Sequence, residues 1–267
     1  MPATLIDARG VTRHHGDRTV LQDVDVRVDA ATRLGVIGPN GSGKSTLLRI
    51  LAGAEAPDGG SVRLHGTVGY LPQLADEAAP PGATVREAIL ERIGVAGASR
   101  AVAEHEARLA AGDLGAVEPH AAALERWLAL GGADAGARVA AAADELGLGP
   151  ALLDRPLAGL SGGQAARAGL AALQAARFDV VALDEPTNHL DADGLGRLTR
   201  MLAARDGGVV LVSHDRALLS ESARELLELD PRTGQATRYA GGWEAYERER
   251  DAARARAVAE HEQALAR

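Results

Sequence analysis

An apolar run, a glycine-rich loop and a run with helical spacing follow one another near the start of the chain. The apolar run extends from Arg33 to Ile37, the loop GPNGSGKS occupies residues 38–45, and the third run extends from Thr46 to Ala52. This order predicts a buried strand, a tight loop and a helix. Such a unit is typical of an α/β protein with a doubly wound, largely parallel sheet.

The loop matches the pattern G-x-x-x-x-G-K-[ST], known as the P-loop. Its glycines let successive backbone N–H groups turn toward phosphate oxygens, and the following helix adds a partial positive charge. Lys44, the only lysine in the chain, supplies a charge to the β- and γ-phosphates, and the Ser45 hydroxyl suits Mg²⁺. A glycine-rich turn without a ligand is the alternative. The expected binding residues are Gly38, Pro39, Asn40, Gly41, Ser42, Gly43, Lys44, Ser45 and Thr46.

Two acids follow the apolar strand predicted from Val180 to Leu183. In a doubly wound sheet, this strand places Asp184 beside the P-loop, where it can hold Mg²⁺ directly or through water. Glu185 would then lie where water attacks the γ-phosphate, so it is the candidate general base. On its own, an acidic pair after a strand is more often a helix cap, but the P-loop in the same chain favours the catalytic interpretation.

A second glycine motif, Leu160-Ser161-Gly162-Gly163-Gln164, precedes a helical run from Gln164 to Ala176. Ser161 is a predicted N-cap, and the two glycines expose backbone N–H groups, which makes a second anion-binding helix start. The P-loop already surrounds the phosphates of one nucleotide. We therefore expect the second site to meet the nucleotide of a different chain or domain, with an ordinary glycine turn as the alternative.

The rest of the pattern predicts an α/β fold with an inserted helical subdomain at about residues 76–165. Valines alternate with polar residues from Val20 to Val28, and a short strand fits Val68 to Leu71. The α/β pattern returns with a helix from Leu195 to Ala204 and a strand from Val209 to Val212. Because the strands at 180–183 and 209–212 are apolar throughout, we expect a sheet covered on both faces.

Composition narrows the function further. The absence of cysteine excludes disulfides, zinc–cysteine sites and thiol nucleophiles, and a net charge of −8 argues against a general electrostatic grip on nucleic acid. No secretory signal is visible from Met1 to Gly10, and no run of 18 apolar residues exists. We expect a cytoplasmic protein without a membrane-spanning segment.

The order of P-loop, Gln73, LSGGQ, the Asp184-Glu185 strand and His214 resembles the ATP-binding cassette (ABC) ATPases. The resemblance implies an ABC-type nucleotide-binding domain of the P-loop NTPase class, with ATP and Mg²⁺ as ligands. It implies that Gln73 senses Mg²⁺ and the attacking water, that Asp191 crosses a dimer interface, and that His214 contacts the γ-phosphate. A histidine after a strand is otherwise usually structural. His15 occupies the position where an aromatic side chain usually stacks on adenine.

Three further segments resemble the ABC-F subfamily: EPTNHLD at residues 185–191, SHDR at 213–216 and YAGGWEAYE at 239–247. The resemblance implies a cassette at 1–242 and, at 243–267, the start of a charged helical linker to a second cassette. It also implies action on the ribosome, in translation or in antibiotic resistance. The run from Glu244 to Arg267 has almost no large apolar residues, so a frayed C-terminal helix is the alternative. The chain would be half of a longer protein or a natural single cassette.

The predicted activity is ATP hydrolysis in a composite site, with two cassettes facing head to tail and each Ser161 closing over the other's ATP. A transporter ATPase subunit and a non-catalytic ATP-gated clamp are the alternatives. The charged tail and the run from Asn188 to Asp191 favour a ribosome-acting ABC-F cassette over the transporter subunit. Glu185 disfavours the clamp, which would not need a general base. Ribosome or rRNA contacts would come from the linker, the second cassette and local arginines. Candidate arginines, which are interleaved with acids and also fit a solvated helix face, are Arg248, Arg250 and Arg254.

Overall fold

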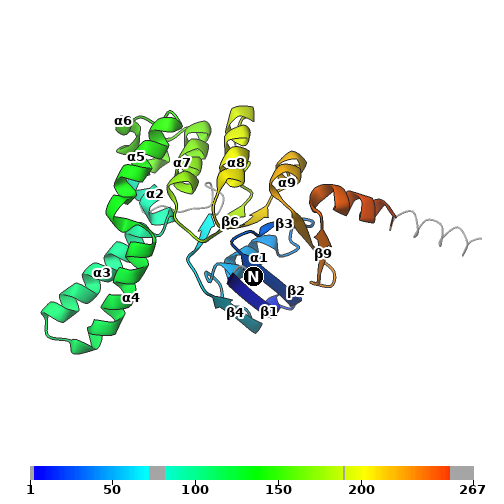
Figure 1. Ribbon diagram of the computed structural model, residues 1–267, viewed down its shortest axis with the longest axis horizontal. Helices are drawn as coiled ribbons and strands as arrows, with labels where there is room; N and C mark the ends of the chain where they lie inside the picture. Colours follow the sequence, from blue (N-terminus) through cyan, green and yellow to red (C-terminus); the bar gives the residue numbers. More distant parts are fainter. Residues whose placement is uncertain (1–2, 72–81, 189, 253–267) are drawn as a thin grey trace, which may run out of the picture.

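The computed structural model describes residues 3–71, 82–188 and 190–252. Their strands form a three-stranded sheet in the order β2-β1-β4 and a six-stranded sheet in the order β5-β6-β7-β3-β8-β9 (Figure 1). The strands are β1 Thr4–His15, β2 Arg18–Asp29, β3 Arg33–Ile37, β4 Gly59–Leu64, β5 Val68–Leu71, β6 Val180–Asp184, β7 Gly208–Val212, β8 Glu225–Leu229 and β9 Ala236–Ala240.

Helices cover the six-stranded sheet and form an elongated lobe beside it (Figure 1). The α-helices are α1 Lys44–Leu51, α2 Val85–Arg92, α3 Val95–Ala110, α4 Val117–Ala129, α5 Ala135–Glu145, α6 Pro150–Leu153, α7 Gly162–Ala175, α8 Ala192–Ala204 and α9 Arg216–Ser222. Residues 242–252 form a further helix after β9. Short 3₁₀ turns are η2 Leu114–Ala116, η3 Gly132–Asp134 and η4 Leu157–Gly159.

The six-stranded sheet is parallel except at β9, which pairs antiparallel with β8. Because β3, β6 and β7 run in the same direction, their carboxyl ends meet at one edge. The P-loop follows β3 at this edge, and Asp184 at the end of β6 is in register with Val212 at the end of β7. The topology thus gathers the loop and the acids that the sequence separates by some 140 residues.

Both faces of this sheet are buried, as the apolar strands predict. In β6, Val181 and Leu183 belong to the core formed with the helical lobe, α7, α8 and α9. The alternating residues Val180 and Ala182 belong to a second core with α1 and the three-stranded sheet. The two-residue period of a strand divides its side chains between the two layers.

Helix α1 lies between the two sheets and anchors the P-loop. Leu47, Leu48, Ile50 and Leu51 are at most 1% exposed, and they pack in one core with strand residues such as Ile6. Each fully buried side chain of this kind contributes about 1.5–3 kcal/mol relative to an exposed one. The end of the loop is therefore held by a well-buried helix that begins at Lys44, two residues before the predicted start.

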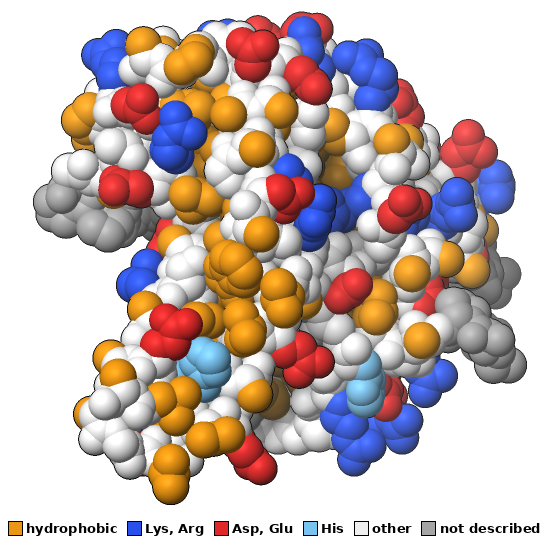
Figure 2. Space-filling view, turned by 60° about the vertical axis from the view of Figure 1, so that its left-hand side comes forward, with side chains coloured by type: hydrophobic (Ala, Val, Ile, Leu, Met, Phe, Trp, Pro, Cys, Tyr) orange, Lys and Arg blue, Asp and Glu red, His pale blue; other side chains and the backbone are white. Residues whose placement is uncertain are grey.

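Helices α2 to α6 occupy the segment predicted to be helical, from 85 to 153. Within this segment α3 and α4 form a hairpin that extends away from the sheet (Figure 1). Figure 2 shows apolar side chains over the face of the helical lobe, and those exposed on the hairpin are Leu114, Val117, Leu124 and Leu128. Residues 76–81 lie outside the described part of the chain, so the subdomain boundaries at 76 and 165 stay a prediction.

The sequence pattern did not predict four strands, and it did not show that the C-terminal helix begins against the cassette. The alternation of apolar and polar residues does not reveal β1, because this strand contains register shifts. It does not reveal β4, because the side chains of β4 are half-buried or exposed. Strands β8 and β9 lack a clear alternation. In the C-terminal helix Tyr246 is only 5% exposed, because its ring packs on the cassette and its hydroxyl bonds Glu228.

Candidate functional site

The P-loop turns sharply between β3 and α1. Gly38 has φ 147°, and a Cβ there would lie 2.7 Å from the carbonyl oxygen of Leu229 and 2.7 Å from the Ser42 hydroxyl. Gly43 is the N-cap of α1 with φ 98°, a conformation that only glycine adopts without strain. The loop needs glycine at both ends, so that its backbone N–H groups and the start of α1 face the same side.

The Lys44 ammonium lies over the loop. Its Nζ donates hydrogen bonds to the carbonyl oxygens of Gly38 at 2.9 Å and Pro39 at 3.0 Å. Burial lowers the pKa of Lys44, while the nearby carboxylates of Glu185 and Asp184 act in the opposite direction. Lys44 thus places its positive charge over the loop, near the carboxylates of Asp184 and Glu185.

Asp184 is held by a tyrosine that the sequence analysis missed. Tyr70, on β5, donates its hydroxyl to Asp184 Oδ2 at 3.0 Å. Burial and the Asp184 charge raise the pKa of Tyr70 to about 12, so the phenol stays protonated and keeps donating. Tyr70 pairs with Ala182 in the sheet register, and this pairing, which the sequence does not reveal, brings it to the site.

Glu185 follows in a strained backbone conformation. Its φ is 46°, which is uncommon for a non-glycine residue and costs of the order of 1 kcal/mol. The turn directs its carboxylate to His214, whose backbone N–H donates to Oε2 at 3.2 Å. The other oxygen, Oε1, lies 3.3 Å from His214 Nε2 and accepts no hydrogen bond among the described residues. This buried oxygen therefore keeps hydrogen-bonding capacity that no described residue uses.

A cavity of about 390 Å³ unites these groups. Lys44, Ser45, Asp184, Glu185 and His214 all line it, although they come from three separate segments. His15 lines the same cavity, at the end of β1, with its side chain half exposed. Predicted residues that line the cavity are His15, Asn40, Gly41, Gly43, Lys44, Ser45, Thr46, Asp184, Glu185 and His214.

Arg18 is a second residue that the sequence analysis missed. It lines the cavity and donates hydrogen bonds to the carbonyl oxygens of Gly41, at 3.1 Å, and Pro231, at 3.2 Å. Its position depends on the pairing of β1 with β2, and no local motif marks it.

The chemistry of this cavity fits a magnesium nucleotide. No cluster of three His, Asp or Glu side chains that could hold a metal alone occurs among the described residues. Mg²⁺ usually binds one or two protein oxygens and takes the rest from phosphates and water. Ser45 and Asp184 provide that pair. The Ser42 hydroxyl is buried without a partner among the described residues, so it has hydrogen-bonding capacity left in the loop.

The second glycine motif lies outside this cavity. Ser161 caps α7 in a capping box: its Oγ accepts the Gln164 N–H at 3.3 Å, and Gln164 Oε1 accepts the Ser161 N–H at 3.0 Å. Ser161, Gly162 and Gly163 are exposed, and a Cβ on either glycine would meet nothing within 4 Å. Within one chain, therefore, this helix start does not face the P-loop cavity.

Asp191, which was predicted to cross a dimer interface, lies at the start of α8. Asp191 is the N-cap of α8 and accepts the Gly194 N–H at 2.8 Å. It lines a separate cavity of about 480 Å³ together with Gly163. Gln73 lies outside the described residues, so its roles toward Mg²⁺ and water stay predictions.

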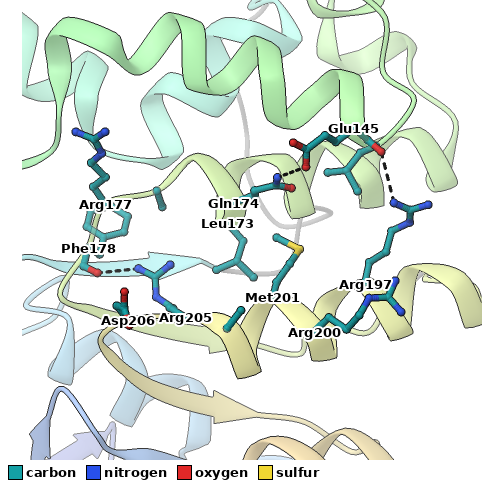
Figure 3. A pocket seen from close by; sticks show the side chains of 13 residues that line it. Glu145, Leu173, Gln174, Arg177, Phe178, Arg197, Arg200, Met201, Arg205 and Asp206 are labelled. Carbon is teal, nitrogen blue, oxygen red and sulfur yellow. Dashed lines mark hydrogen bonds between the residues drawn. The ribbon is translucent and has the colours of Figure 1, made fainter.

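A larger cavity of about 520 Å³ lies at the opposite edge of the sheet, before β6 and β7 (Figure 3). It is rich in arginine, but Arg177 pairs with Asp134 and Arg197 pairs with Asp193, both at 2.8 Å. Arg205 donates to the Phe178 carbonyl oxygen at 2.7 Å. The Arg205 bond thus joins the end of α8 to the segment before β6, whereas the Arg197–Asp193 pair lies within α8.

Sequence comparison assigns the family. Residues 21–188 match the family described as ABC transporter. The chain belongs to this family, whose cassettes bind ATP and are ATPases. Solved structures agree on the fold: the chain resembles "Dimeric Structure of MJ0796, a Bacterial ABC Transporter Cassette" with a TM-score of 0.63 at 18% identity, covering 88% of this chain and 98% of the other.

Two curated relatives are ABC-F proteins, which confirms the resemblance to that subfamily. The chain is 39% identical to "Tylosin resistance ATP-binding protein TlrC" of Streptomyces fradiae over 92% of its length and 45% of the relative's. It is 35% identical to "Energy-dependent translational throttle protein EttA" of Mycobacterium tuberculosis over 88% of its length and 42% of the relative's. The chain thus spans less than half of these relatives. Within its described residues, no helix is long and apolar enough to cross a membrane.

Proposed function

We propose that this chain hydrolyses ATP in a site shared by two cassettes, and that closure of the pair acts on the ribosome in the cytoplasm. The observation that carries the proposal is the junction of Glu185, His214 and the P-loop in one cavity. Phosphoryl transfer to water needs a positioned base beside a phosphate cradle and a metal, and these residues supply the first two. Ser45 and Asp184 would hold Mg²⁺, which would supply positive charge to balance the charge of the phosphates.

Each residue has a distinct part in this proposal. The loop N–H groups and Lys44 bind the β- and γ-phosphates, and His15 stacks on adenine. Glu185 accepts the proton of the attacking water, while the His214 backbone N–H holds its Oε2. The strained turn at Glu185 fixes this orientation before the nucleotide arrives, so little reorganisation accompanies the reaction.

The place of the second glycine motif supports the proposal of a shared site. Ser161 and its glycines expose an anion-binding helix start that their own P-loop cavity does not include. A second cassette facing head to tail would present this surface to the γ-phosphate. The relatives' names, which mention translation and antibiotic resistance, support the ribosome as the target of closure.

Glu185→Gln tests the assignment of the base. The variant should bind ATP and hydrolyse it at least about 100-fold more slowly, since removal of a general base costs that much or more. The exposed Glu118→Gln on α4 serves as the matched control and should retain activity. Hydrolysis by Glu185→Gln at the wild-type rate would rule out Glu185 as the base.

The same variant tests the partner. With ATP, Glu185→Gln in a protein that also carries the linker and a second cassette should co-sediment with ribosomes, because the closed pair cannot reopen by hydrolysis. Lys44→Ala should not co-sediment under the same conditions. Absence of ATP-dependent co-sedimentation by Glu185→Gln would contradict the ribosome proposal and leave the ATPase proposal intact, whereas association with a purified membrane permease would favour a transporter subunit.

A further inference from the structure

Two tyrosines share one carboxylate at the base of the C-terminal helix, and a tryptophan packs beside one of them. Tyr239 and Tyr246 donate their hydroxyls to the two oxygens of Glu228, at 3.0 and 2.9 Å. The rings of Tyr239 and Tyr246 meet edge to face at 5.0 Å, and Trp243 lies 5.3 Å from Tyr246. We call Tyr239, Trp243 and Tyr246 the aromatic cluster. It fixes helix 242–252 to β8.

The aromatic cluster reaches the P-loop through β8. Glu228 is the register partner of Ile37, the last residue of β3 before the loop. The next residue, Leu229, places its carbonyl oxygen against Gly38, where a Cβ would approach it to 2.7 Å. A shift of Glu228 would therefore displace the strand end that supports the first glycine of the loop.

The aromatic cluster also reaches the turn that carries His214. The Arg216 guanidinium lies 5.7 Å from the ring centre of Trp243, in cation–π contact. Arg216 is the first residue of α9, two positions after His214. A cavity of about 330 Å³ is lined by Gly38 and His214 together with Trp243 and Tyr246. This cavity is separate from the nucleotide cavity of about 390 Å³, and His214 lines both.

We propose that Trp243 and Tyr246 are positioning residues of the nucleotide site, which couple the placement of helix 242–252 to binding of the γ-phosphate. They act through Arg216 on the His214 turn and through Glu228 on the P-loop. The inference rests on the proposed function in one respect, that His214 contacts the γ-phosphate. Burial and the bond to Glu228 raise the pKa of both Tyr239, to about 12, and Tyr246, so both hydroxyls remain donors at physiological pH.

Coupling of this kind is reciprocal. If a bound triphosphate alters the aromatic cluster, a change in the cluster must alter triphosphate affinity by the same factor. The effect should fall on ATP more than on ADP, because only ATP carries the γ-phosphate that His214 faces. General loosening of the fold would weaken binding of both nucleotides alike.

Tryptophan fluorescence tests the first half of the coupling. The chain has two tryptophans, and Trp127 lies on α4 with its indole N–H bonded to Ser99. In the full chain with Trp127→Phe, emission therefore reports Trp243 alone. Adenylyl imidodiphosphate with Mg²⁺ should change this emission and ADP should change it less, while Lys44→Ala should abolish the change. Unchanged emission at saturation, with binding verified by equilibrium dialysis, would overturn the proposal.

Affinity measurements test the second half. Trp243→Ala and Tyr246→Phe should each weaken binding of adenylyl imidodiphosphate about fivefold or more relative to ADP, the lower end of coupling between distinct sites. Trp243→Phe should restore part of the loss, and Glu244→Gln, an exposed neighbour on the same helix, is the control. Equal weakening of both nucleotides, or no weakening, would contradict the coupling. Failure of the wild-type chain to bind nucleotide would instead refute the proposed function, and the coupling with it.

Discussion

Lys44 lies in the P-loop and is the only lysine in the chain, so chemical labelling of amines can report on it selectively. It is 7% exposed, burial lowers its pKa, and it bonds two carbonyl oxygens of its own loop. A bound triphosphate would compete for its ammonium and cover it. The single lysine therefore offers a direct probe of nucleotide binding at the level of one side chain.

Amine-selective acylation at pH 8–9, followed by peptide mapping, should modify Lys44 and the N-terminal amine. The lowered pKa leaves more of Lys44 neutral, and hence nucleophilic, than an ordinary lysine at this pH. ATP should protect Lys44 and leave the N-terminal amine unprotected. Equal labelling of Lys44 with and without saturating ATP would place the phosphates elsewhere.

Tyr70 illustrates a residue whose importance depends on one hydrogen bond. Tyr70→Phe removes the donor to Asp184 and should lower the free energy of unfolding by about 1.5 kcal/mol, the lower end for bonds to charged groups. The pKa of Tyr70 rises from 10.0 to about 12 on folding. Its contribution is therefore complete below pH 10 and is lost as pH rises toward 12, so denaturation at pH 7 and pH 8 should give the same loss. A loss that differed between these two pH values would contradict the assignment.

At the scale of elements, two capping boxes that differ in their surroundings occur in the part of the chain that the structure describes. Ser161 and Gln164 begin α7, and Thr84 and Glu87 begin α2. Both serine and threonine accept the N3 backbone N–H, so replacement of either by alanine should lower the free energy of unfolding by about 1 kcal/mol. Only the first box belongs to the proposed shared site.

Ser161→Ala should therefore lose most ATPase activity, while Thr84→Ala should lose similar stability and keep its activity. Chemical denaturation and steady-state hydrolysis on the same preparations separate the two effects. If both variants lose activity in proportion to stability, Ser161 acts only as a cap.

The elements also show what the sequence can and cannot predict. The P-loop, the Asp184-Glu185 strand and the Ser161 cap were predictable because each depends on a few adjacent residues. Arg18 and Tyr70 were not, because pairing between strands brings them to the cavity. The aromatic cluster was missed in the same way, since Glu228 satisfies two tyrosines from separate segments.

For the whole molecule, the central claim is that one chain does not contain a complete catalytic centre. The cavity with Lys44 and Glu185 excludes Ser161, which faces outward. Head-to-tail pairing would give each chain both roles, as in a closed two-fold dimer. ATPase activity per molecule should consequently rise with protein concentration, and a rate that is independent of dilution would argue against a shared site.

Mixing two inactive variants tests this claim most directly. Lys44→Ala removes the phosphate charge, and Ser161→Arg obstructs the opposing helix start, so each variant alone should be nearly inactive. A mixed pair joins the intact P-loop of one chain to the intact Ser161 of the other. The account predicts that equal mixing restores about a quarter of wild-type activity, since random pairing gives half mixed dimers with one intact site each. Activity in the mixture that stays at the level of the separate variants, while the wild-type chain hydrolyses ATP, would contradict it.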